Sequence, residues 1–93
     1  MASSAARVAT GRPPHYLRQI CRHFGHNVQA SHARVHGTIT FADGMLELDA
    51  SDPQLLVLAA TAQDADALER IEQVVASYLE RIGRADDLTV AWT

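Results

Sequence analysis

Three histidines spaced closely along the chain are the first residues whose chemistry suggests a function. His23 and His26 are three residues apart near the end of an expected helix, where side chains at this spacing lie on neighbouring positions. His36 supplies a third imidazole if the exposed side of its strand meets that helix end. Three imidazoles with an open position suit Zn²⁺ or Fe²⁺, so His23, His26 and His36 form a candidate metal site. Structural hydrogen bonds and proton transfer are the alternative roles.

Cys21 precedes His23 by two residues, but helix geometry argues against a shared ion. On a helix these two side chains point about 160° apart. Cys21 falls on the apolar stripe, so we expect a small buried residue there. As the single cysteine of the chain, it also excludes an internal disulfide.

The same helix carries a basic face, which is the second candidate site. Arginine at this spacing grips phosphate or carboxylate groups bidentately. The face predicts a contact with an acidic partner protein through Arg12, His15, Arg18 and Arg22. A solvated helix face is the alternative. Because the chain has no lysine and a net charge of −3, we expect no nucleic-acid partner.

Charge is divided unevenly between the two halves of the chain. The first acidic residue is Asp43, so residues 1–42 carry five arginines and all five histidines without an acid. Residues 43–93 carry three arginines against eleven acids. Every candidate residue therefore lies in the basic half.

Size and composition bound the class of protein. A chain of 93 residues with 47% hydrophobic content builds one modest core. The sequence has no secretory signal and no apolar run of about 20 residues, so we expect a cytoplasmic domain without a membrane partner. No nucleophile elbow, phosphate-binding glycine loop or HExxH motif is present, which favours a non-enzymatic domain. A small enzyme using His23 or His36 as general base is the alternative.

The elements that position these residues follow from the hydrophobic period. Steps of three and four predict helices over residues 13–24 and 62–82, the second with Thr61 as its N-cap, and alternation predicts strands over 5–10, 34–41, 45–50, 55–60 and 88–92. Asp43 and Gly44 predict a hairpin turn. The order β-α-β-β-β-α-β predicts an α+β two-layer sandwich with a mostly antiparallel sheet and both helices on one face. Residues 1–4 are expected to be frayed and residues 5–93 to form a single domain.

The stretch from Tyr16 to His26 resembles the core motif of a small bacterial family, domain of unknown function 2218. It reads YLRQICRHFGH, similar to the family pattern Y-L-x-x-L-C-x-H-[FW]-x-H-K. H-G-x-I-x-F from residue 36, the following Gly44 and L-x-V-x-W from residue 88 extend the resemblance over nearly the whole chain. Asn27 departs from the pattern, since the family usually has lysine there.

The resemblance implies a function as well as a fold. Family members occur alone or attached to siderophore-interacting flavin reductases, which implies an accessory domain associated with ferric-siderophore handling and such a reductase as partner. The motif histidines map onto His23, His26 and His36, which would bind a metal, a siderophore-bound ion or a redox partner. The alternative is a protein–protein interaction module that uses Arg12, Arg18 and Arg22.

Overall fold

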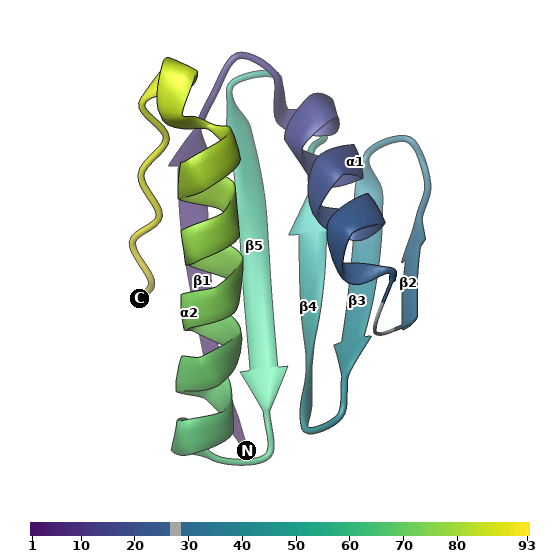
Figure 1. Cartoon of the computed structure of the whole chain (residues 1–93), viewed down its shortest axis with the longest axis vertical. Helices are drawn as coiled ribbons and strands as arrows, with labels where there is room; N and C mark the ends of the chain where they lie inside the picture. The colour runs from purple at the N-terminus through teal and green to yellow at the C-terminus, as the bar shows by residue number, and fades with distance from the viewer. Residues whose placement is uncertain (27–28) are drawn as a thin grey trace.

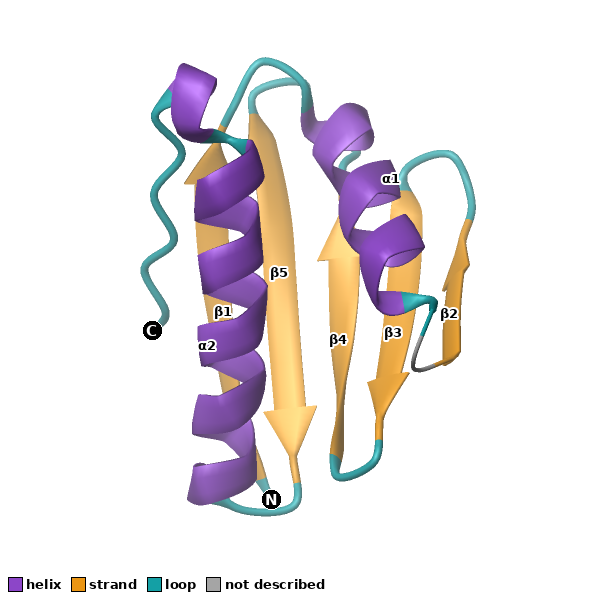
Figure 2. Cartoon of the chain, in the orientation of Figure 1, coloured by secondary structure: helices purple, strands orange, loops and turns teal. Residues whose placement is uncertain are grey.

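The computed structural model describes residues 1–26 and 29–93, and places five strands in one antiparallel sheet of order β1-β5-β4-β3-β2. Two helices cover one face of this sheet (Figures 1 and 2). The elements are β1 (Ala2–Ala9), α1 (Pro13–Phe24), β2 (Gln29–His32), β3 (His36–Phe41), β4 (Gly44–Asp49), β5 (Leu55–Ala62), α2 (Ala65–Ile82) and the 3₁₀ turn η1 (Arg84–Asp86). Asn27, where the family motif has lysine, lies outside the described residues.

The predicted fold class, an α+β sandwich with both helices on one face, is confirmed. From β1 to α2 the elements follow the expected order with one strand added, β2, whose polar residues show no apolar alternation. The N-cap of α2 is Asp64 rather than the predicted Thr61. The strand predicted over residues 88–92 is not formed, and the C-terminal stretch contributes only Thr93, which exchanges two backbone hydrogen bonds with Ala5 of β1 (N···O 3.1 and 2.9 Å). The prediction of a frayed start is corrected, because residues 2–4 belong to β1 and pair with residues 60–62 of β5.

The hairpin between β3 and β4 turns one residue earlier than predicted. Phe41 pairs with Gly44, so Ala42 and Asp43 form the turn and Gly44 begins β4. Gly44 does not have a positive φ. Its role is a close approach to β5, since a Cβ there would lie 2.5 Å from the carbonyl oxygen of Thr61.

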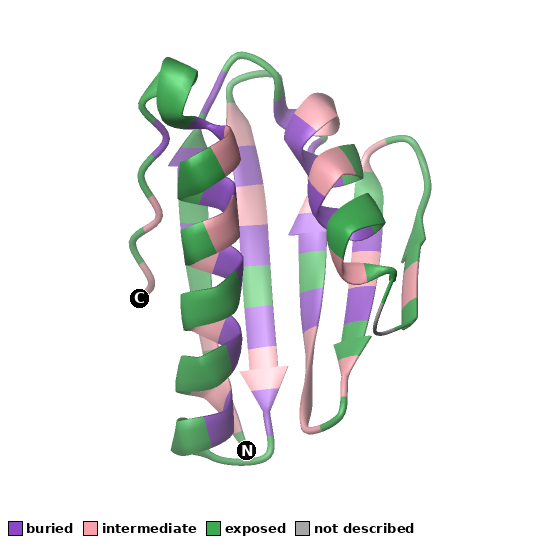
Figure 3. Cartoon of the chain, in the orientation of Figure 1, coloured by how far each residue is buried: buried purple, intermediate pink, exposed green. Residues whose placement is uncertain are grey.

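The core lies between the sheet and the two helices. Side chains alternate along the strands, and in β5 every second residue, on the side of the helices, is buried (Figure 3). On α2 the buried positions recur every fourth residue, which gives one apolar stripe. The largest fully buried side chains include Leu17, Ile20, Ile39, Leu46, Leu48, Leu56, Leu58, Val75 and Leu79. Cys21, expected to be buried, is 3% exposed.

Both helices are amphipathic, with polar outer sides. The longer one, α2, has 18 residues, and its outer side includes Asp66, Glu69 and Glu80. No helix in the described part of the chain is long and apolar enough to cross a membrane. The cytoplasmic location and the absence of a membrane partner stay predictions.

Candidate functional site

The three histidines of the predicted metal site do not come together in the structure. His23, in the last turn of α1, stacks on the ring of Tyr78 from α2, with centroids 3.8 Å apart and planes at 11°. His36 is exposed and lies opposite Asp49 in the β3–β4 register, on the sheet face away from the helices. Within residues 1–26 and 29–93, no group of three or more His, Cys, Asp or Glu side chains is placed to hold an ion. The fold therefore does not assemble a site from His23, His26 and His36.

The stacking of His23 links the two helices. Tyr78 also receives the edge of the Phe24 ring, with centroids 5.8 Å apart, and the Arg81 guanidinium lies 5.4 Å from its ring centre. Edge-to-face aromatic contacts such as the one between Phe24 and Tyr78 add to the energy of area burial. These contacts favour the alternative interpretation, in which His23 has a structural role.

The basic face predicted on α1 is divided among different environments. Arg12 pairs with Asp86 across 2.8 Å, and the ring of His15 meets Tyr16 edge-on at 5.0 Å. Arg22 is exposed and takes part in neither of the two ion pairs found among the described residues. Arg18 lines a groove that the sequence did not predict. The four residues therefore have different surroundings, and their contact with an acidic partner stays a prediction.

Arg12 belongs to a network that ties the start of α1 to η1. The Tyr16 hydroxyl donates to Asp86 Oδ2 at 2.5 Å, and Arg12 Nη2 donates to both Asp86 Oδ2 and Tyr16 Oη, at 2.8 and 3.2 Å. These hydrogen bonds lower the pKa of the Asp86 carboxyl, with the Tyr16 bond contributing most. Burial, followed by the bond to Asp86, raises the pKa of the Tyr16 hydroxyl. In the sequence, Asp86 is only one of two adjacent loop acids without an identifiable partner.

Replacing Asp86 by asparagine is expected to remove an acid-sensitive part of the stability. A carboxyl whose folded pKa lies below its unfolded value of about 3.9 stabilises the fold above that value, and this contribution is lost as pH falls through the folded pKa. Urea denaturation between pH 6 and pH 2.5 should therefore show a smaller loss for Asp86→Asn than for the wild type. Asp87→Asn is the matched control, since Asp87 has a φ of 54° that asparagine also tolerates. A wild-type profile in Asp86→Asn would contradict the assignment.

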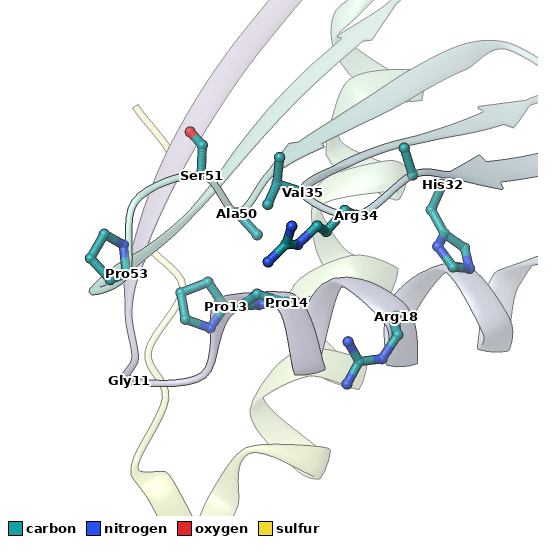
Figure 4. A pocket seen from close by; sticks show the side chains of 11 residues that line it. Gly11, Pro13, Pro14, Arg18, His32, Arg34, Val35, Ala50, Ser51 and Pro53 are labelled. Carbon is teal, nitrogen blue, oxygen red and sulfur yellow. The ribbon is translucent and has the colours of Figure 1, made fainter.

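The groove beside Arg18 opens between the start of α1, the turn from β2 to β3 and the loop from β4 to β5 (Figure 4). Its volume is about 630 Å³. Apolar walls come from the prolines at the start of α1, from Pro53 and from Val35. Arg18, His32 and Arg34 supply every titratable side chain of its lining. We call this feature the basic groove.

Charge in the basic groove is not neutralised by the protein. Neither Arg18 nor Arg34 forms an ion pair with any described residue; the pairs present are Arg12–Asp86 and Arg70–Asp43. The first turn of α1 contains no acidic residue, so the positive end of its dipole adds to the same potential. The groove is therefore electropositive.

The acids of the neighbouring loop are engaged locally and do not line the basic groove. Asp49 accepts a hydrogen bond from the Ser51 backbone N–H at 2.8 Å, and Asp52 accepts one from the Gln54 N–H at 2.7 Å. The side-chain hydrogen bond from Ser51, followed by the one from its backbone N–H, lowers the pKa of the Asp49 carboxyl. These loop carboxylates therefore form turns and leave the arginines of the groove free.

The segments that carry the groove residues are fixed by backbone bonds. Ala33 N–H donates to His36 C=O at 2.8 Å and closes the two-residue turn that holds Arg34. Ala50 N–H donates to Val35 C=O at 2.7 Å, which ties this turn to the end of β4. Proline is favoured in a first helical turn and fixes the start of α1. The guanidinium of Arg34 therefore projects from a held turn toward α1 (Figure 4).

Of the three titratable groove residues, only Arg18 was predicted from the sequence as a binding residue. Arg34 was expected as the first residue of a strand, and His32 had no predicted role. The available signal was the acid-free stretch of residues 1–42 together with two prolines that begin a helix without an acidic first turn. The sequence pattern did not predict β2. The turn from β2 into β3 brings His32 and Arg34 to α1, so their place in the groove could not be predicted either.

Comparisons with known proteins agree with this fold. A family model described as "Uncharacterized protein conserved in bacteria (DUF2218)" matches residues 5–93. The structure is similar to the NMR structure of PA4090 from Pseudomonas aeruginosa, with a TM-score of 0.83 and 30% identity over 100% of this chain and 96% of that one. No curated protein matches the sequence.

Proposed function

The chain belongs to the DUF2218 family of uncharacterised bacterial proteins, and we propose that it is a binding module that holds an anionic group in the basic groove. One observation carries the proposal: Arg18 and Arg34 line the groove with His32, and neither arginine has an acidic partner among the described residues. A guanidinium presents a planar fork of N–H donors that matches carboxylate and phosphate. An anion bound in the groove therefore provides the negative charge that pairs with Arg18 and Arg34.

The contents of the groove favour binding over catalysis. Its lining has one hydroxyl, Ser51, and one imidazole, His32. A nucleophile is activated by a base within hydrogen-bond reach. Among the described residues, no hydrogen bond joins the side chains of Ser51 and His32, and the Ser51 hydroxyl bonds to the Asp49 carboxylate instead. We accordingly propose a module that binds its ligand without catalysing a reaction.

Both ligands predicted from the sequence, an acidic partner protein and a ferric siderophore, are compatible with the basic groove. The acidic partner protein expected for Arg12, Arg18 and Arg22 would reach Arg18 and Arg34 instead, because Arg12 is engaged by Asp86. The association with ferric siderophores stays a prediction of the family resemblance. A ferric complex of carboxylate or catecholate donors carries negative charge, so such a complex is a chemically suitable ligand for this groove. Iron or zinc held by His23, His26 and His36 is not part of the proposal.

Titration of ¹⁵N-labelled protein followed by NMR tests the groove. The probes are inorganic phosphate and acetyl-triglutamate, with acetyl-triglutamine as the uncharged match. We expect saturable shifts from the charged probes at the amides of Arg18, His32, Arg34 and Ser51, and none from triglutamine. Arg34→Gln should weaken the binding of the charged probes about tenfold, because one charge-assisted hydrogen bond contributes about 1.5 kcal/mol.

The control variant is Arg84→Gln, which removes an exposed arginine outside the groove. It should bind as the wild type does. Shifts spread evenly over Arg7, Arg22 and Arg84, or equal affinity in Arg34→Gln, would show a non-specific charge effect and overturn the proposal.

A further inference from the structure

The basic groove adjoins a free edge of the sheet, and from this we infer that its occupant is an extended acidic segment of a partner protein that pairs with β2. The inference rests on the proposed function and adds the class of ligand. β2 is the last strand in the order β1-β5-β4-β3-β2. An edge strand presents unpaired N–H and C=O groups that template the addition of another strand.

The register shows which backbone groups are free. Ala33 N–H bonds to His36 C=O, and the direction of backbone groups alternates along a strand. Ser31 therefore directs its groups toward β3, whereas Ala30 and His32 direct theirs away from the sheet. No other described residue forms a hydrogen bond to the backbone of Ala30 or His32. These two residues offer the pairing sites of an added strand.

The opposite edge of the sheet is occupied in part by the chain itself. There Thr93 exchanges two backbone hydrogen bonds with Ala5 of β1, and Thr93 Oγ1 also bonds to the Ala5 carbonyl at 3.3 Å. The described structure contains no comparable contact along β2. Among the described residues, the edge beside the basic groove thus lacks the partial cover that the β1 edge has.

His32 joins the edge to the groove. It pairs with Gly37, a position under α1 where a Cβ would lie 2.9 Å from Cys21 Sγ. The His32 side chain is therefore on the helix side and lines the groove, while its backbone faces the free edge. An added strand places every second side chain on that same side. Acids at alternate positions of the partner would therefore point toward His32, Arg18 and Arg34.

A second copy of this chain does not offer a suitable strand. The first acidic residue is Asp43, so β2 and everything before it lack the carboxylates that the groove requires. Pairing of two β2 edges would leave the arginines of both copies without partners. Charge complementarity favours an acidic segment from a different protein.

The probe is an eight-residue peptide of alternating glutamate and threonine, whose acids share one side when extended. A peptide of the same composition with acids in adjacent pairs is the matched control. Two further versions carry N-methyl groups on all threonines or on all glutamates. Alternate residues point their N–H groups to opposite edges, so only one methylated version should lose affinity.

We expect the alternating peptide to bind at least tenfold tighter than the paired one and than one of the two methylated versions. Hydrogen exchange at the Ala30 and His32 amides should slow at least tenfold in the complex. Sedimentation of the free protein should show a monomer, and a dimer whose formation protects Ala30 and His32 would overturn the inference.

The remaining outcomes separate the two proposals. Equal affinity of all four peptides, each weakened tenfold by Arg34→Gln, would overturn strand addition and leave the groove as the binding site. Affinity that depends on N-methylation but not on Arg34 would overturn both the groove and the acidic ligand. Weaker binding of one methylated peptide, together with weaker binding of the peptides to Arg34→Gln, supports both the groove and strand addition.

Discussion

Changing Arg18 and Arg34 together to glutamate is expected to weaken the binding of the alternating acidic peptide by about 100-fold. Each arginine donates a charge-assisted hydrogen bond worth about 1.5 kcal/mol, and each tenfold in affinity corresponds to about 1.4 kcal/mol. Both residues line the basic groove, and neither has an acidic partner among the described residues. The introduced carboxylates also repel the peptide. Isothermal calorimetry at low salt measures the change.

The matched control changes Arg22 and Arg84 to glutamate, which gives the same net charge as the first variant. Both residues are exposed and lie outside the groove. This control also separates the groove from the helix face predicted by the sequence, which includes Arg22 but not Arg34. Equal losses in the two double variants would mean that overall charge, rather than the groove, attracts the peptide. Raising the salt concentration should weaken the wild-type complex, because exposed charges are screened.

Hydrophobic period was sufficient to predict most of the fold. Alternating residues such as Leu46 and Leu48 identify β4, and steps of four such as Ile71 and Val75 identify α2. β2 had no such signal, because Gln29–His32 contains only one apolar residue and is mostly exposed. A short edge strand is held by pairing with its neighbour rather than by its own pattern, so its formation depends on β3.

The basic groove was only partly predictable for the same reason. Arg18 was recognised as a helix-surface cation, which depends on local spacing alone. Arg34 and His32 reach α1 only after β2 turns into β3. The contact between Tyr16 and Asp86 likewise joins residues 70 positions apart, and no local pattern marks it. Long-range placement, rather than residue type, was the missing information.

The predicted metal site does not form, because the alternation of the strand itself places His36 on the side away from the helices. The alternation over residues 36–41 places Ile39 on the buried side and His36 on the exposed side of its strand. Both helices cover the buried side, so an exposed side chain in the middle of the sheet faces away from them. His36 therefore lies across the sheet from His23, and the spacing of His23 and His26 on α1 cannot compensate.

Replacing Gly44 by alanine is expected to lower the free energy of unfolding by about 2–3 kcal/mol, because overpacking a tight site costs about 1–3 kcal/mol and the obstacle here is largely backbone. A Cβ at Gly44 would lie 2.5 Å from the Thr61 carbonyl oxygen and 3.1 Å from Ala62 Cα, both in β5. It would also lie 2.5 Å from Ile71 Cδ1, a side-chain end that can turn aside. β4 and β5 must therefore separate locally.

Gly11→Ala is the control, since nothing lies within 4 Å of a Cβ at Gly11 and its φ is not positive. Alanine at such a position restricts the unfolded chain, so a stability change of about +0.5 kcal/mol is expected. Urea denaturation followed by circular dichroism measures both variants. A large loss at Gly44 with no loss at Gly11 identifies close strand packing as the requirement. Equal values would instead mean that Gly44 is not required for close packing, and that β4 and β5 adjust to the added methyl group at little cost.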